Sequence, residues 1–269
     1  MGSYDLERLA EPSLAVGYRI AEPFPHVVLE DFVRVPEQEI ADAFPGPEWE
    51  HWANRTSRFQ PGKSSCRDIE AMPPTLRAMV HELGEPPFLR ALCALTGIPH
   101  LLPDPYLQGG GLQWTGPGGE LSRHTDFHFH RTLPLFRRAN VLIFLSSGWK
   151  EGDGGELCLF NLGDDRAVVT IPPRFGTCAI FTTDHRSVHA VRPISASARP
   201  RQSIACFYYT VESAEIFSGD RRARWYVDDE RDHTPMERAR LLAMKTSMSA
   251  SKTLVRVAYR IDPQRPDLV

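Results

Sequence analysis

Residues 122–130 read Ser-Arg-His-Thr-Asp-Phe-His-Phe-His and place a histidine and an aspartate two positions apart. In an extended segment, side chains at this spacing leave on the same face, so His124 and Asp126 can take adjacent positions on one metal ion. The pattern His-x-Asp also arises by chance in chains that bind no metal. A metal site therefore needs a third ligand elsewhere in the sequence.

His189 is the best candidate for this ligand and lies in the apolar run at residues 187–192. Two histidines and one carboxylate on one face of an octahedron leave three positions open, which suits Fe(II) enzymes that bind a cosubstrate and dioxygen together. His185 is an alternative, but it lies in a polar turn, whereas the sequence around His189 is typical of a strand. We therefore predict that His189 is the third ligand.

The composition favours a globular protein that does not bind nucleic acid. The chain has 269 residues, 42% of them hydrophobic, which is enough for a substantial core. Its formal net charge is -3, from 31 basic and 34 acidic residues, and no basic run resembles a nucleic-acid footprint. No apolar run approaches membrane-spanning length, and the first residues lack the features of a signal peptide. We expect a cytoplasmic protein that does not associate with a membrane.

The five cysteines are odd in number and include no Cys-x-x-Cys pair. They predict neither a disulfide framework nor a thiolate zinc site. Cys158, Cys178 and Cys206 lie in apolar runs typical of strands, so we interpret them as small buried hydrophobes.

From about residue 105 the sequence is typical of β structure. Short runs rich in β-branched and aromatic residues, separated by turn signals, occur at residues 139–145, 156–160, 167–171, 177–181, 187–192 and 203–211. With extended pieces near Tyr106 and Leu121 they make about eight strands, the number in a double-sheet jelly roll. The glycines before His124 suit bends and close backbone approach. A phosphate-binding loop would need a Gly-Lys-Ser/Thr ending and a following helix, and both are missing.

Helical patterns flank this β region. Residues 40–44, 74–83 and 87–95 have helical apolar spacing, and residues 235–244 form an amphipathic pattern with Thr234 as a plausible N-cap. We predict a single α+β domain over residues 1–269, with no internal repeat or long linker. It comprises a helical N-terminal layer (1–104), a jelly-roll core (105–211) and a C-terminal helical extension (212–269).

Arg201 and Ser203 open the last predicted strand and alternate with Gln202, so their side chains point the same way. A buried guanidinium is costly without a counter-charge, and a dicarboxylate cosubstrate would supply one through a bidentate pair. The alternative is that Arg201 is a solvated charge in a loop, as we expect for Arg192 and Arg199.

Six stretches in this order resemble the Fe(II)- and 2-oxoglutarate-dependent dioxygenases, and within them the branch related to prolyl 4-hydroxylases. The stretches are Gly109-Gly110-Gly111-Leu112-Gln113, His124-Thr125-Asp126-Phe127, Arg137-Arg138-Ala139-Asn140-Val141-Leu142-Ile143-Phe144-Leu145, Gly154-Gly155-Glu156-Leu157, Val188-His189-Ala190-Val191-Arg192-Pro193 and Arg201-Gln202-Ser203. The resemblance implies a double-stranded β-helix in which His124, Asp126 and His189 bind iron. It also implies that Arg201, assisted by Ser203, holds the distal carboxylate of 2-oxoglutarate.

Four further residues have less definite roles. Asn140 and Gln113 occupy places that line the cosubstrate pocket in such enzymes, but a strand-end hydrogen bond and a surface turn are equally compatible with the sequence. Relatives often have a histidine where Gln113 stands. His128 and His130 would reach the substrate side of the iron if the strand continues, and would otherwise lie in an exposed loop.

The family reaction consumes dioxygen, converts 2-oxoglutarate to succinate and carbon dioxide, and oxidises an unactivated C–H bond; ascorbate serves as reductant in vitro. Halogenating relatives have a small non-coordinating residue where Asp126 stands, so hydroxylation is the default here, although ring closure, desaturation or epimerisation follow from the same chemistry. We expect a small-molecule substrate such as an amino acid, sugar or natural-product intermediate. The alternatives are a peptidyl hydroxylase and a non-catalytic, cupin-like metal-binding protein. Residues 52–67 and those beyond residue 211 contain no motif that identifies the substrate.

Overall fold

The computed structural model describes residues 2–212, 223–226 and 246. The chain separates into two compact units, Met1–Val227 and Asp228–Val269. The helix predicted at residues 235–244, its N-cap Thr234 and most of the C-terminal extension lie outside the described residues, so the single-domain organisation stays a prediction. Within the described part of the chain, no helix is long and apolar enough to cross a membrane.

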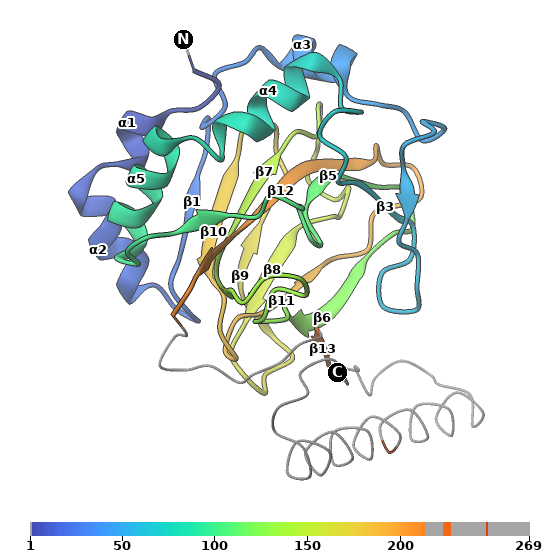
Figure 1. Cartoon of the computed structure of the whole chain (residues 1–269). Helices are drawn as coiled ribbons and strands as arrows, with labels where there is room; N and C mark the ends of the chain where they lie inside the picture. The colour runs from blue at the N-terminus through green and yellow to red at the C-terminus, as the bar shows by residue number, and fades with distance from the viewer. Residues whose placement is uncertain (1, 213–222, 227–245, 247–269) are drawn as a thin grey trace. The chain divides into compact units, whose positions relative to one another are not determined.

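Two antiparallel sheets form the core of the described structure (Figure 1). The larger sheet has the strand order β1-β10-β7-β12-β5-β3-β2, with β4 pairing to β12, and the smaller has the order β13-β6-β11-β8-β9. The strands of the larger sheet are β1 (His26–Leu29), β2 (Ala53–Asn54), β3 (Lys63–Cys66), β4 (Leu102–Pro103), β5 (Gly111–Thr115), β7 (Phe136–Phe144), β10 (Cys178–Thr182) and β12 (Arg201–Thr210). Those of the smaller sheet are β6 (Leu121–Thr125), β8 (Leu157–Phe160), β9 (Ala167–Ile171), β11 (Val188–Val191) and β13 (Arg224–Trp225).

The eight strands expected of a jelly roll are β5 to β12, four in each sheet, and the predicted fold is confirmed. One extended piece was placed wrongly. Tyr106 lies in a turn, where the carboxylate of Asp104 accepts its backbone N–H at 2.8 Å. The strand itself begins at Gly111. Cys158, Cys178 and Cys206 are buried in strands without disulfides, as predicted.

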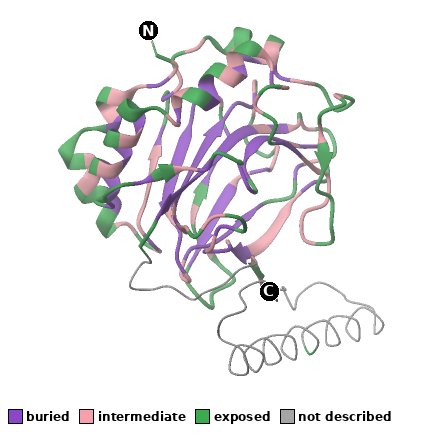
Figure 2. Ribbon diagram, viewed as in Figure 1, coloured by how far each residue is buried: buried purple, intermediate pink, exposed green. Residues whose placement is uncertain are grey.

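Alternation along the central strands builds two hydrophobic cores. In β7, Val141 and Ile143 face one core, while Leu142 and Phe144 face the other. Successive side chains in a strand point to opposite faces, and both faces of this sheet are covered. The strand therefore shows a continuous apolar run instead of alternating polar residues. Figure 2 shows the same distribution, with the buried residues concentrated in the sheets.

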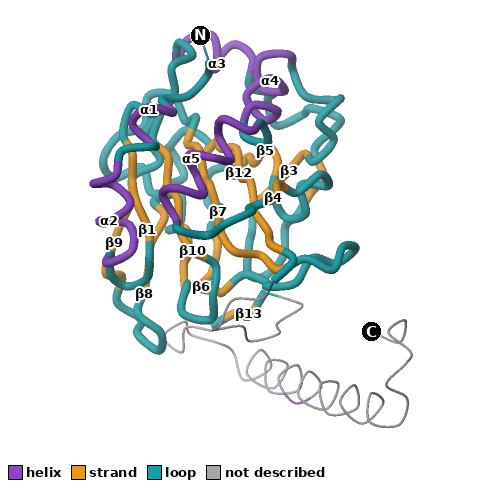
Figure 3. The backbone as a smooth tube through the Cα atoms, turned by 60° about the vertical axis from the view of Figure 1, so that its left-hand side comes forward, coloured by secondary structure: helices purple, strands orange, loops and turns teal. Residues whose placement is uncertain are grey.

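Five helices pack on the outer face of the larger sheet (Figure 3). They are α1 (Leu6–Leu9), α2 (Pro12–Ile20), α3 (Glu37–Ala43), α4 (Pro74–Glu82) and α5 (Pro86–Thr96). In α5, Phe88, Leu92 and Leu95 follow the helical period and are buried, and the helix ends at Gly97 with a φ of 70°. The predicted helical layer is thus present.

The N-terminal region also contributes strands that the sequence analysis missed. Of these, β3 reads Lys-Ser-Ser-Cys and has too few apolar residues to give a strand signal. It is extended because its backbone pairs with β5, a partner that lies far along the chain. This strand lies beside the candidate site described below.

Gly111 allows β3 and β5 to approach each other closely. Its φ is 86°, and a Cβ atom there would overlap the carbonyl oxygen of Cys66. We expect Gly111→Ala to lower the free energy of unfolding by at least about 2 kcal/mol, because the residue is strained at positive φ and the strands must move apart. Urea unfolding measures the loss. Gly46→Ala is the control, because a Cβ there meets nothing within 4 Å; equal losses in the two variants would refute the argument.

Candidate active site

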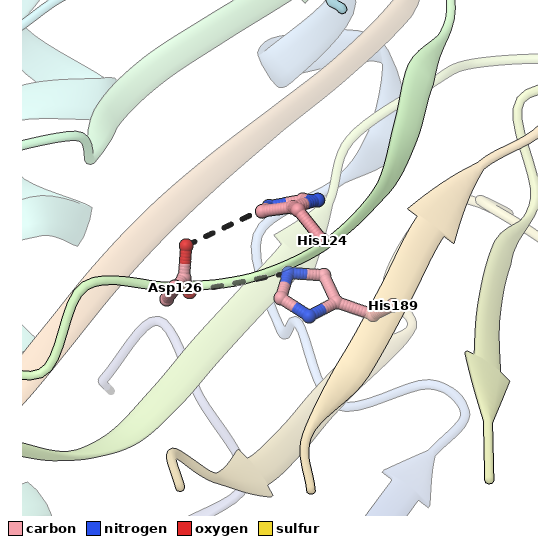
Figure 4. A group of neighbouring side chains, drawn as sticks. All are labelled: His124, Asp126 and His189. Carbon is pink, nitrogen blue, oxygen red and sulfur yellow. Dashed lines mark ion pairs between the residues drawn. The ribbon is translucent and has the colours of Figure 1, made fainter. Parts of the chain in front are cut away.

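Two histidines lie side by side on neighbouring strands of the smaller sheet. His124 on β6 pairs with His189 on β11 in the antiparallel register, and their ring centroids are 4.3 Å apart. Asp126 follows directly after β6 ends at Thr125. Figure 4 shows the three side chains turned toward one another, and one ligand atom from each lies within 4.8 Å of the others. In the described residues, this is the one group of histidine, cysteine or acidic side chains with such a spacing.

The backbone orients both imidazole rings in the same way. Nδ1 of His124 lies 2.9 Å from the carbonyl oxygen of Ser122, and Nδ1 of His189 lies 2.9 Å from that of Ser187. A carbonyl only accepts, so Nδ1 carries the proton and Nε2 keeps its lone pair. Burial, followed by the neighbouring His124, lowers the pKa of His189 to about 4. This ring is therefore neutral near neutral pH, which is the form that binds a metal.

Asp126 is held by its second carboxylate oxygen. Asn140 donates from Nδ2 to Oδ2 at 2.7 Å, and the guanidinium of Arg137 lies 3.1 Å from the same oxygen. Burial alone would raise the pKa of the Asp126 carboxyl, but Arg137 and the two histidines outweigh it and hold this pKa well below its usual range. Asp126 is therefore ionised, and its Oδ1 lies 3.6 Å from Nε2 of His124.

The guanidinium of Arg137 is fully buried between two aromatic rings. It lies 3.8 Å from the ring centroid of Phe127 and 3.7 Å from that of Phe207. Its NH2 donates to the carbonyl oxygen of Gln108 at 3.2 Å and to the hydroxyl of Tyr209 at 3.3 Å. The sequence analysis gave Arg137 no role. The sequence feature that could have indicated such a role is its place as a charged residue at the start of a long apolar strand.

His128 and His130 do not lie in an exposed loop, which was one of the two expectations for them. Both are buried, and neither lines the cavity at the triad. Nε2 of His130 lies 3.1 Å from Oδ1 of Asp104, and its Nδ1 accepts the backbone N–H groups of Thr132 and Leu133. His130 thus fixes the loop after β6. The expectation that both histidines reach the substrate side of the iron required the strand to continue to residue 130. The strand ends at Thr125, so the regular alternation of side chains between its two faces stops there.

A cavity of about 590 Å³, including its open mouth, lies between the two sheets and contains the triad. Gln113 and Asn140 both line it. Gln113 is buried within β5, so a surface turn is excluded, and its Nε2 donates to the carbonyl oxygen of Gly109 at 3.2 Å. The side-chain oxygen of Asn140 also accepts the hydroxyl of Thr183 at 3.1 Å, so its amide connects Asp126 to the residue that directly follows β10.

Arg201 lines the same cavity from the start of β12 and is buried, unlike the exposed Arg192 and Arg199. Its NH1 donates to the hydroxyl of Ser203 at 3.3 Å, while its Nε is buried without a hydrogen-bond partner. Burial lowers the pKa of its guanidinium to about 10. A buried guanidinium with an unused donor fits a carboxylate ligand.

Residues 110–209 match the family model of the 2OG-Fe(II) oxygenase superfamily. This stretch, 100 of the 269 residues, contains the triad and Arg201 and is similar to that superfamily. No curated protein matches the sequence. The chain shares its fold with a prolyl-4-hydroxylase from Pseudomonas putida, at 17% identity and a TM-score of 0.52, over 74% of this chain and 99% of that one.

Two further structures that are similar to this chain contain different ligands. A prolyl hydroxylase from Trichoplax adhaerens, in complex with a hypoxia inducible factor peptide fragment, has 17% identity and a TM-score of 0.53, over 76% of this chain and 90% of that one. The epimerase SnoN from nogalamycin biosynthesis, in complex with Fe3+, alpha ketoglutarate and nogalamycin RO, has 16% identity and a TM-score of 0.51, over 84% of this chain and 98% of that one. The shared fold therefore does not determine the substrate class.

The matched region indicates an oxidoreductase that uses iron and 2-oxoglutarate, and the observed residues fit both groups. Two imidazole nitrogens and a carboxylate oxygen form a donor set typical of non-haem Fe(II). The buried Arg201 has the unused donor that a carboxylate of 2-oxoglutarate requires. When bound, iron and 2-oxoglutarate would supply the chemistry that activates dioxygen, in which 2-oxoglutarate becomes succinate and carbon dioxide.

Proposed function

We propose that this oxygenase hydroxylates an unactivated C–H bond of a small-molecule substrate. In the proposal, Nε2 of His124, Nε2 of His189 and Oδ1 of Asp126 hold the iron. The observation that carries it is the convergence of these three side chains in a cavity that also contains the guanidinium of Arg201, whose Nε has no hydrogen-bond partner. The retained Asp126 favours hydroxylation, because a carboxylate fills the position that a halide would need.

The side chains around the triad have supporting roles in this proposal. Arg201 and Ser203 bind the distal carboxylate of 2-oxoglutarate. Asn140 orients Asp126 and faces the same cavity, and Gln113 lies beside the cosubstrate. Leu142 and Phe181 form apolar walls that exclude water.

The lining of the cavity supports a small substrate. It combines apolar side chains with a few polar and charged groups, which is typical of pockets that bind small molecules. We propose an amino acid, a sugar or a natural-product intermediate as the substrate class. A peptidyl hydroxylase remains the second candidate, since the same fold occurs with a bound peptide fragment in the Trichoplax adhaerens structure.

A substrate screen tests the proposal. Purified protein receives Fe(II), ascorbate and 2-oxoglutarate with panels of small metabolites and of peptides. Mass spectrometry then detects products that have gained one oxygen atom, and succinate is measured in parallel. We expect succinate at a slow rate without substrate and a faster rate with a small molecule. Oxidation of peptides alone would favour the second candidate, and no succinate under any condition would support a non-catalytic metal-binding protein.

Arg201→Met provides a separate test of cosubstrate binding. We expect the 2-oxoglutarate concentration for half-maximal succinate formation to rise by about a hundredfold, because a charge-assisted pair is lost. Metal binding should not change. Arg199→Met is the matched control, since Arg199 is exposed two residues earlier. An unchanged response to 2-oxoglutarate in Arg201→Met would contradict its role and would favour the non-catalytic alternative.

A further inference from the structure

A second cation lines the cavity from a strand outside the predicted jelly roll. Thr115 on β5 pairs with Lys63 on β3 on one side and with Arg201 on β12 on the other. Residues directly opposite on neighbouring strands have their side chains on the same face of the sheet. All three residues line the cavity that contains the triad. The sheet thus holds an ammonium and a guanidinium on either side of one threonine hydroxyl.

The spacing of the strands brings both cations within reach of one small anion. Neighbouring strands lie about 4.8 Å apart, so the Cα atoms of Lys63 and Arg201 are about 10 Å apart with Thr115 between them. The next row on the same face consists of Ser65, Gln113 and Ser203. This corner of the cavity therefore offers charged and neutral hydrogen-bond donors around the hydroxyl of Thr115.

Neither of these two cations forms an ion pair in the described part of the chain. No carboxylate oxygen among those residues lies within 4.0 Å of the Lys63 ammonium or the Arg201 guanidinium. Burial, followed by the charge of Arg201, lowers the pKa of Lys63 to about 8. Two like charges held in one half-enclosed corner destabilise the ligand-free protein, and a bound anion would remove that cost.

We propose that Lys63 is a second binding residue for the distal carboxylate of 2-oxoglutarate. It contacts one carboxylate oxygen from β3, while Arg201 contacts the other from β12 and the hydroxyl of Thr115 lies between them. The inference depends on the proposed function, because it assigns a residue to the cosubstrate named there. Its consequence is selectivity: the pair of cations favours 2-oxoglutarate over 2-oxo acids that lack the second carboxylate.

A comparison of two ligands tests this contact directly. The protein is loaded with Zn(II), and calorimetry measures its affinity for 2-oxoglutarate and for 2-oxopentanoate, which has the same chain length without the distal carboxylate. We expect Lys63→Met to weaken 2-oxoglutarate binding by about tenfold to a hundredfold while leaving the affinity for 2-oxopentanoate nearly unchanged. Lys63→Arg should restore most of the loss. Lys150→Met is the control, because Lys150 is exposed.

The outcomes separate this inference from the proposed function. Retention of wild-type affinity in Lys63→Met, or an equal loss for both ligands, would overturn the inference while the cosubstrate site remains. A wild-type protein that does not bind 2-oxoglutarate, or does not prefer it to 2-oxopentanoate, would overturn the proposed function itself. Thermal unfolding checks that the variant folds, and without ligand it should be at least as stable as the wild type, because a repulsive charge is removed. If Lys63→Met does not fold, Lys63→Gln takes its place.

The affinity for 2-oxoglutarate should also fall as the pH rises from about 7 to about 9. The carboxylate binds the charged ammonium, so ligand binding raises the pKa of Lys63 from its ligand-free value of about 8. Above that pH the ammonium must first take up a proton before the carboxylate can bind it, and this weakens binding. Arg201, Arg55 and Asp126 act electrostatically on Lys63, and Glu120 lines the same cavity. Lys63→Arg should remove most of the decline, because arginine keeps its charge. An identical decline in this variant would count against the role of Lys63.

Discussion

Replacing His189 with alanine is expected to abolish succinate formation and the binding of stoichiometric iron. The Nε2 lone pair of His189 faces Asp126 because the backbone fixes Nδ1, and apart from His124 no other described histidine joins this group. Loss of an outer-shell partner typically costs about tenfold to a hundredfold in metal affinity or activity, so loss of a ligand should cost more than about a hundredfold. Metal analysis of the purified variant and the rate of succinate release are the two measurements.

His185→Ala is the matched control for this prediction. His185 is four residues earlier in the chain and is not part of the converging group. It was the alternative third ligand, so the pair of variants also decides between the two histidines. We expect His124→Ala to behave like His189→Ala and His185→Ala to retain wild-type activity. Unaltered succinate formation in both His124→Ala and His189→Ala would exclude the triad.

Replacing Arg137 with methionine is expected to destabilise the protein strongly. The guanidinium is buried between Phe127 and Phe207 and lies 3.1 Å from Oδ2 of Asp126. Its removal leaves a mostly buried carboxylate without its cation, and breaking such a pair costs about 3–5 kcal/mol. Thermal unfolding of the metal-free protein should show a lower midpoint, by about 2–4 °C for each kcal/mol lost.

Metal binding provides an independent check on this explanation. A bound divalent cation replaces part of the missing positive charge beside Asp126, so the destabilisation of Arg137→Met should be smaller in the presence of Zn(II) than in its absence. Arg138→Met is the control: this neighbouring guanidinium donates to the hydroxyl of Thr210, at the opposite end of β12 from Arg201. An equal loss in both variants, or no recovery with metal, would refute the charge argument.

The sequence alone indicated the jelly roll and the residues of the metal site. Strand periodicity is a local property, so the runs that became β7 to β12 were visible without knowing their partners. The two-residue spacing of His124 and Asp126 is likewise local. His189 and Arg201 were singled out because each lies in sequence typical of a strand, and the family resemblance implied their roles.

The tertiary structure alone decided what surrounds those residues. Arg137 lies eleven residues after Asp126 and meets it only because the loop after β6 folds back. Lys63 precedes the jelly roll in a polar strand with no β signal of its own, and pairing with β5 places it level with Arg201. A strand's own residues fix which side chains share a face, but they do not specify which distant strand lies next to it. Long-range hydrogen bonding and packing make that choice, because the backbone groups of each strand must be paired when it is buried.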